Sequence, residues 1–295
     1  MKVTRREWMA GLAAGSVLWA QEEEDRYRAI WDSGLRSKRP PAAVTGPGGG
    51  PVVRVPKPRY EAAGSGPRPA PGTGDVIGLT IWKMREPRAD EGDAPRLLVF
   101  GASKKAKLPM VAERLQPSLP LRAGDKVRLS IEVAREGFLY LIDRELYRDG
   151  RRGAPYLLFP SRRVRGGNNA VRAGMLVDIP SQEDEPLSME PQGGEYAGEE
   201  LSILVTARQL DLAPAGDGPK ALAPAMVDGW EARWKRPAAR LDLESQGGGL
   251  WTAREQMSAQ GGALLTQADP MPQFVFQAQG APEDGLLIQY RLIVG

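Results

Sequence analysis

The stretch between residues 121 and 180 places the strongest limit on how this chain can fold. Apolar and polar side chains alternate through residues 126–133, and a period of two is typical of a strand with one buried face. Three further apolar runs follow at residues 138–142, 156–159 and 175–179, and the last two stop at a proline. Such runs suit a pleated, buried surface, so the stretch predicts a β-sheet domain.

Segments on both sides of this stretch extend the pattern. We expect further strands at residues 77–85, 96–100, 201–206, 273–278 and 286–294. Eight or nine strands at this spacing, mostly joined by turns, indicate an all-β fold, either an antiparallel β-sandwich or a barrel. The last run, residues 286–294, is almost continuously apolar, which predicts a strand in the middle of a sheet.

Two helices are expected as a small insertion between residues 211 and 270, packed on one edge or end of the sheets. Residues 221–236 have helical apolar spacing and are followed by Pro237. Thr252 and Glu255 match the Ser/Thr-x-x-Glu capping box, which opens the second helix. A further short strand is expected between the two helices, at residues 240–244.

Residues 1–20 have the composition of a signal peptide, with a basic start, a short apolar run and a small residue before a polar break. The pair Arg5 and Arg6 resembles a twin-arginine export signal, and the alternative is an ordinary secretory signal with two incidental arginines. We therefore expect a periplasmic or secreted protein that is cleaved after Ala20. Contact with a membrane is expected only if this segment stays uncleaved.

Residues 21–74 are expected to connect the signal peptide to the folded body. Residues 21–33 can form a short helix that is marginal alone and must dock or fray. Residues 34–74 contain nine Pro and nine Gly, a composition that cannot bury enough apolar surface to offset chain entropy. We expect this part to be a disordered linker, and residues 75–295 to form the β domain.

Composition excludes several kinds of chemistry. The chain has no Cys and no His, so it has no disulfide, thiolate nucleophile, Cys/His zinc site or imidazole base. Its formal charge of +3 falls mostly on the N-terminal part: residues 1–20 carry +2 and residues 21–74 carry +3, which leaves residues 75–295 at −2. The overall basicity therefore gives no reason to expect a nucleic-acid partner.

Several motifs of the central stretch occur in a familiar order: the turn Gly124-Asp125, the strand Gly137-Phe138-Leu139-Tyr140, the ending Leu158-Phe159-Pro160, and the close Ala173-Gly174 with Ile179-Pro180. In this order they resemble the bacterial family called domain of unknown function 4384, over about residues 120–207. The resemblance implies a compact β domain in an exported or fused protein. It implies no catalytic residue, and Phe138 stands where many members have Tyr.

Arginines are concentrated beside the central strands. One hypothesis is an anion-binding or partner-binding surface, in which guanidinium groups bind phosphate or carboxylate on an envelope polymer. The alternative, which we favour, is surface charge that balances nearby acids while the long stems cover sheet edges. The candidate binding residues are Arg144, Arg148, Arg151, Arg152, Arg162, Arg163 and Arg165.

Acidic and aromatic residues give weaker signals. Asp143 and Glu145 lie two apart at a strand end, so they face the same side and could form the carboxylate pair of a glycosidase. That spacing is commonplace, and the acids after Asp178 lack an ordered calcium-loop spacing. We therefore assign no catalytic residue, metal or cofactor. The tryptophans Trp82, Trp230, Trp234 and Trp251 are expected to be packing residues.

Together these observations predict an exported, non-catalytic binding or scaffold module of the bacterial cell envelope. Its partner would be an envelope protein or an anionic envelope polymer. The alternative is a carboxylate-dependent envelope hydrolase that acts on glycans, although the absence of histidine weighs against it.

Replacing Arg162, Arg163 and Arg165 together with Ala tests the arginine hypothesis. We expect unchanged binding to purified peptidoglycan and lipopolysaccharide in a titration, because surface charge contributes little to specific recognition. A clear loss of binding would instead identify these arginines as an anion site.

Overall fold

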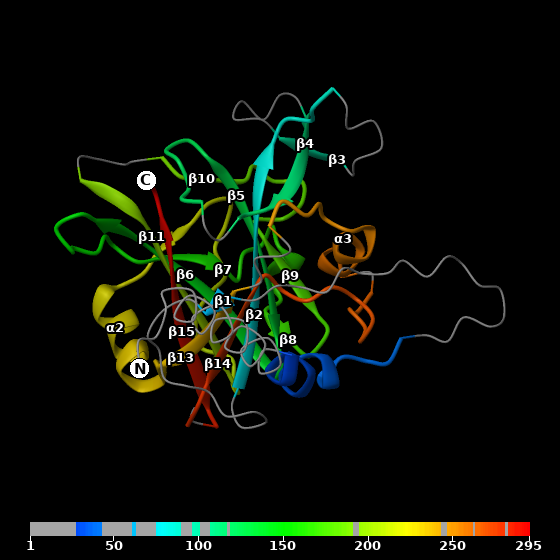
Figure 1. The fold of residues 1–295 in the computed structure, drawn as a ribbon. Helices are drawn as coiled ribbons and strands as arrows, with labels where there is room; N and C mark the ends of the chain where they lie inside the picture. Colours follow the sequence, from blue (N-terminus) through cyan, green and yellow to red (C-terminus); the bar gives the residue numbers. More distant parts are fainter. Residues whose placement is uncertain are drawn as a thin grey trace, which may run out of the picture.

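Two antiparallel β-sheets face each other in this computed structural model (Figure 1). It describes residues 28–42, 61–62, 75–89, 96–100, 107–116, 119–190, 195–242, 247–261, 263–280 and 283–295. The chain is mostly β, with two antiparallel sheets and few helices, which confirms the all-β prediction. The signal peptide expected at residues 1–20 lies outside the described residues.

The first sheet has β2 and β5 at its centre. Its strands run in the order β1 (Glu61–Ala62), β13 (Ala238–Asp242), β14 (Phe274–Ala278), β2 (Asp75–Arg85), β4 (Lys107–Arg114) and β3 (Arg96–Phe100). Strand β5 (Lys126–Val133) also pairs with β2, and it carries β9 (Leu176–Ile179) and β10 (Leu187–Ser188).

The second sheet is built around the long strands β6 and β11. Its order is β12 (Lys220–Ala221), β7 (Tyr156–Phe159), β6 (Gly137–Tyr147), β11 (Tyr196–Thr206) and β15 (Gly285–Ile293), and β8 (Ala170–Val171) pairs with β6. The ends of β7 and β9, at Pro160 and Pro180, are where the sequence places them, and both prolines follow cis peptide bonds.

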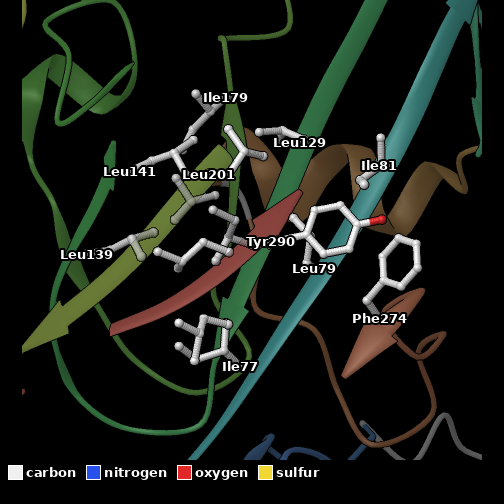
Figure 2. Close-up of a cluster of buried hydrophobic side chains, with 14 of the residues drawn as sticks. Ile77, Leu79, Ile81, Leu129, Leu139, Leu141, Ile179, Leu201, Phe274 and Tyr290 are labelled. Atoms are coloured by element: carbon white, nitrogen blue, oxygen red, sulfur yellow. The ribbon is translucent and has the colours of Figure 1, made fainter. Parts of the chain in front are cut away.

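Every second side chain of the central strands points into one core between the sheets. Figure 2 shows this cluster, in which Leu79 of β2 and Leu129 of β5 lie with Leu141 of β6 and Leu201 of β11, and all four are at most 1% exposed. Each fully buried side chain of this kind contributes about 1.5–3 kcal/mol. The predicted period-two burial therefore joins the two sheets.

The outer face of the first sheet is buried as well, which differs from the prediction of strands with one exposed face. Arg128, Ser130 and Glu132 on the polar face of β5 are at most 1% exposed. Helix α3 (Ala253–Ala259) and residues 28–42 cover this face. Alternation in the sequence therefore separates the two faces of β5, but it does not distinguish solvent from a polar cover.

The two predicted helices lie on opposite outer faces of the sandwich rather than together at one edge (Figure 1). Helix α2 (Pro224–Trp234) packs on the second sheet, where Trp234 is buried and Trp230 is partly buried. Strand β13 joins the first sheet between them, so the chain crosses from one side of the sandwich to the other.

Helix α3 begins with the predicted capping box. The Thr252 hydroxyl accepts a hydrogen bond from the backbone N–H of Glu255, and the Glu255 carboxylate accepts one from the Thr252 N–H. Beside this helix, Trp82 and Trp251 stack with ring centroids 5.4 Å apart. The packing role expected for these tryptophans is confirmed.

Part of the segment expected to be a disordered linker is docked on the body. Residues 28–34 are helical and η1 (Arg36–Lys38) follows, with Ile30 and Leu35 fully buried. Arg39 is also buried, and it forms two hydrogen bonds to Glu132, at 2.8 and 2.7 Å. The short helix expected at residues 21–33 is therefore docked over its described part, with Ile30 buried. Leu35 and Arg39 lie in the segment 34–74 that was expected to be disordered, because an average over the whole segment does not register two well-placed side chains. Residues 43–60 and 63–74 lie outside the described residues.

Strands β4 and β15 also differ from the sequence prediction. Strand β4 was not expected, and Pro109 lies within it at a position beyond the end of β2, where a missing N–H breaks no pairing with β2. Strand β15 was expected in the middle of a sheet, but it is the last strand of the second sheet. Its inner face is apolar because it meets the core, and Leu287 on the outer face packs in the cluster under α2, whereas Gln289 and Arg291 on that face bind Glu200.

In the part of the chain that the structure describes, no helix combines the length and the apolar character needed to cross a membrane.

Replacing Arg39 with Ala should lower the free energy of unfolding by about 3–5 kcal/mol, because it leaves the buried carboxylate of Glu132 without its cation. Urea denaturation measures the change. Arg36→Ala is the matched control, since its ion pair with Asp32 is exposed and should contribute under about 1 kcal/mol. Equal effects of the two substitutions would contradict a docked N-terminal segment.

Candidate functional site

The inner face of the second sheet changes from apolar to acidic toward one end of the sandwich. On β6 the core residue Leu141 is followed, at every second position, by Asp143 and Glu145. On β11 Glu199 precedes the core residue Leu201 in the same way. Strand pairing places Glu199 opposite Glu145 and Leu201 opposite Asp143, so three carboxyl groups from adjacent strands share one face.

A β-bulge on β11 brings a tyrosine to the same face. The strand register shifts between Tyr196 and Gly198, with Ala197 as the extra residue. Tyr196 and Glu199 would face opposite sides of a regular strand, but the bulge brings them together, and the Tyr196 hydroxyl donates to Glu199 Oε1 at 2.7 Å. Gly198 has φ 141°, and a Cβ atom there would lie 1.9 Å from the backbone oxygen of Leu292. The bulge therefore requires glycine.

A second bulge lies on β7. Leu157 and Phe159 pair with consecutive residues of β6, which leaves Leu158 as the extra residue. Leu158 is partly buried and packs against the edge of the core. Bulges redirect single side chains, and this one turns Leu158 toward the acidic end of the sheet.

These side chains line a cavity of about 470 Å³ between the end of the second sheet and β10 of the first. That volume lies within the range of small-molecule sites. Apolar walls surround an acidic part. The described residues around the cavity include no Lys or Arg: Asp143, Glu145, Tyr156, Leu158, Leu187, Ser188, Met189, Glu190, Glu199, Leu201, Pro219 and Leu292.

Two acids of this cavity have raised pKa values. Burial raises the pKa of Asp143 well above its ordinary value, and the negative charge of Glu199 and a hydrogen bond with Glu199 raise it further. Burial also raises the pKa of Glu199, although a hydrogen bond from Tyr196 offsets part of that rise. Two adjacent buried carboxyl groups do not both ionise readily. Asp143 therefore keeps a proton and donates a hydrogen bond to Glu199.

Three buried carboxyl oxygens in this cavity have no hydrogen-bond donor among the described residues: Asp143 Oδ1, Glu145 Oε1 and Glu199 Oε2. The other oxygens of the two glutamates are occupied, because the Tyr147 hydroxyl donates to Glu145 Oε2 at 2.5 Å and Tyr196 donates to Glu199 Oε1. One proton on Asp143 links that residue to Glu199 but brings no donor to Glu145. An unsatisfied buried acceptor costs about 1–3 kcal/mol, so the cavity suits a ligand that supplies N–H or O–H donors.

A smaller cavity of about 240 Å³ adjoins the first, since both are lined by Leu158, Leu187 and Pro219. Its polar wall contains Arg163, whose guanidinium is bound by Asp184 in an ion pair. We call the two adjoining cavities the groove, which is lined by β7 and residues 217–219 on one side and by β9 and β10 of the other sheet on the other side.

Two of the candidate arginines attach α2 to the second sheet. Arg144 Nη2 lies 2.8 Å from Asp228 Oδ1, and Arg152 pairs with Glu231. Arg152 Nε also lies 2.8 Å from Glu200 Oε1 on β11. Both arginines therefore have structural partners on elements that they hold together.

Three other candidates have local partners. Arg151 pairs with Asp149 at 2.6 Å and lies over the ring of Tyr147, while Arg163 pairs with Asp184. Arg165 donates to the backbone oxygen of Ala170 at 3.0 Å.

The last two candidates, Arg148 and Arg162, are exposed, and in the described ranges their side chains have no hydrogen-bond or ion-pair partner. The structure thus distributes the seven arginines among separate contacts and does not gather them around one cavity.

Sequence reasoning missed Glu199 as a partner of Asp143 and Glu145. Its signal was present, because Glu199 continues the face of Leu201 and Ile203, just as Asp143 continues the face of Leu141. An acid at the next position of an inward-facing series is the recognisable pattern. Which two strands carry such series side by side depends on pairing, which the sequence pattern does not show.

Two further observations limit the chemistry. Among the described residues, no group of three or more acidic side chains is arranged to hold a metal ion. Asp178 has a pKa that burial raises to about 7, but it accepts a hydrogen bond from Ser130 behind the first sheet and lines neither cavity.

In comparisons with known proteins, no family model, curated protein or solved structure matches this chain.

Replacing Asp143 with Asn should weaken the pH dependence of stability. An acid with a raised pKa in the folded state keeps a proton that the unfolded chain has lost, so the free energy of unfolding falls as pH rises above about 4. The substituted amide stays neutral throughout, so urea denaturation between about pH 5 and 8 should show a shallower fall than in the wild type.

Asp149→Asn is the control for this experiment. Asp149 is exposed, and hydrogen bonds from Arg151 lower its pKa. The stability that its charge contributes to the protein is therefore lost only at more acidic pH, outside the range of this experiment. Asp178 contributes the same decreasing slope to every variant and cancels in the comparison. An unchanged slope in Asp143→Asn would show that Asp143 is ionised in the folded protein.

Proposed function

We propose that this protein is an exported, non-catalytic binding module of the bacterial cell envelope, and that the acid-lined cavity at the end of the sandwich is its ligand site. The observation that carries the proposal is a cavity of about 470 Å³ with three buried carboxyl oxygens, from Asp143, Glu145 and Glu199, to which no backbone N–H and no other side chain of the described residues donates. The proton that Asp143 keeps is shared only within this set. Buried acceptors of this kind are costly to leave unsatisfied, and a ligand with donors offsets that cost.

Export and family membership belong to the same proposal. The signal-peptide pattern of residues 1–20, with its pair of arginines, supports a periplasmic or secreted location. The motifs between residues 120 and 207 support membership of the family called domain of unknown function 4384.

A carboxylate-dependent hydrolase of envelope glycans is the second candidate. One observation favours it, because a protonated acid beside an ionised one is the pair that acid–base catalysis uses. The geometry argues against it. Glycosidase carboxyl groups stand about 5–10 Å apart with the substrate bond between them, whereas Asp143 and Glu199 are hydrogen-bonded to each other.

A single introduced cysteine tests the proposed site, since the chain contains no cysteine of its own. Ser188→Cys places a thiol at the exposed rim of the cavity, where a thiol-reactive photo-crosslinker can be attached to the full exported protein. We expect it to capture one envelope component reproducibly, and the purified component to bind the unmodified protein.

Ala232→Cys is the matched control, because it is exposed on α2 over the outer face of the second sheet. Equal capture from both positions would contradict a ligand site at the cavity. Incubation with purified peptidoglycan tests the second candidate. Release of soluble sugar fragments that disappears in Asp143→Asn would support hydrolysis and overturn the binding proposal.

A further inference from the structure

The chemistry around the cavity narrows the class of ligand. We propose that it binds a primary ammonium group on an unbranched alkyl stem, as in a lysine side chain of a partner polypeptide. This inference rests on the proposed function of the cavity as a binding site and names what that site recognises.

The charge of the cavity favours a cation. Asp143, Glu145, Glu190 and Glu199 line it, with no basic side chain among the described residues that surround it. The arginines nearest in sequence are engaged elsewhere, as in the ion pairs of Arg144 and Arg152 with acids of α2. A cation entering this partly enclosed space meets carboxylates at low effective dielectric, where attraction is stronger than in water.

Hydrogen bonding favours an ammonium group over a guanidinium group. A guanidinium fork binds best to both oxygens of one carboxylate. Here Tyr147 already occupies Glu145 Oε2 and Tyr196 already occupies Glu199 Oε1, so each glutamate offers one oxygen. An ammonium group carries three donors that rotate on a single nitrogen, which suits single oxygens from separate carboxyl groups.

A metal ion is a poorer match. Calcium takes six to eight oxygen ligands at short distances. In the described part of the chain no three acids are close enough together to hold a metal ion. Two carboxyl groups that share a proton also have less negative charge than a divalent cation requires.

The walls of the cavity suit an alkyl stem. Leu158, Leu187, Met189 and Leu292 line it together with the acids. A lysine side chain has four methylene groups between its backbone and its ammonium group, so the stem can contact these walls while the charge reaches the carboxyl groups.

The adjoining cavity favours a lysine that belongs to a polypeptide over a free diamine. It continues the groove past Leu158, Leu187 and Pro219, and it provides the ion-paired side chains of Arg163 and Asp184 as polar partners for a peptide backbone. A free diamine fills only the first cavity, whereas a peptide extends into both.

Binding should strengthen as pH rises. The ammonium group takes the place of the proton shared by Asp143 and Glu199, so binding releases a proton. The other titratable groups that face this pair are Glu145 on β6, Tyr156 on β7, Tyr196 on β11 and Glu190 after β10. Burial raises the pKa of Tyr196 above its ordinary value, so the change between pH 5 and 8 comes from the carboxyl pair of Asp143 and Glu199.

The test uses the full exported protein and a blocked pentapeptide with a central lysine between alanines, followed by ligand-detected NMR at pH 5 and pH 8. We expect saturable binding that is tighter at pH 8. A peptide with norleucine in place of lysine keeps the stem without the charge and should bind at least about tenfold more weakly. Peptides with arginine or acetylated lysine, 1,5-diaminopentane and calcium chloride complete the set of probes.

Glu199→Gln should weaken lysine-peptide binding by at least about tenfold, because it removes one charge and leaves the shape unchanged. Glu136→Gln is the matched control, since Glu136 is exposed at the opposite end of β6. Ser188→Trp blocks the rim without changing an acid and should also abolish binding. It therefore tests the site independently if Glu199→Gln does not fold.

Equal binding of the lysine and norleucine peptides, or no binding of either, would overturn the inference. If calcium or the arginine peptide binds more tightly than the lysine peptide, the choice of an ammonium group is overturned. If the diamine binds more tightly than the lysine peptide, the assignment to a polypeptide is overturned. If Ser188→Cys captures a partner that the lysine peptide does not displace, the proposed function stands and only this inference fails. If Ser188→Cys captures nothing specific, the proposed function fails as well.

Discussion

Contact between the inner faces of the two sheets determines the rest of this structure. Leu79, Leu129, Leu141 and Leu201 come from four strands and meet in one cluster without solvent. Burial of this kind is the largest favourable contribution to folding, and it fixes strand register because a slip of one residue would turn each apolar face outward. Once the register is set, the residues that follow Leu141 on the same face must lie at the rim of the core, and there they are acids.

Polar layers outside the sheets give the fold its specificity. Arg39 binds Glu132, Arg114 binds Glu255 at 2.5 Å, and Ser130 links Trp82 to Asp178, all beneath the helical cover of the first sheet. Buried ion pairs gain little net stability because desolvation offsets their attraction. They do set which segment can cover which face, since any other docking would leave a charge unpaired.

The candidate site arises where this regular architecture is interrupted. Bulges at Ala197 and Leu158 rotate single residues toward the end of the core, and Gly198 allows the first of them. The arginines that dominate the sequence near these strands serve mainly to attach α2 and to close local loops. The acids that form the cavity are fewer and less conspicuous, yet three of their buried oxygens accept no hydrogen bond from the backbone or from another side chain of the described residues.

Local pattern alone determined the positions of the long strands β2, β5, β6, β11 and β15, the capping box at Thr252 and the absence of thiol and imidazole chemistry. Each of these depends on residues close together in the chain or on composition. Only the tertiary structure decided that β15 lies at a sheet edge, that Leu35 and Arg39 dock on the body, and that Glu199 meets Asp143. Those outcomes depend on strand pairing and on which segment covers which face. Period-two alternation identifies a buried face, but it does not identify the element that buries it.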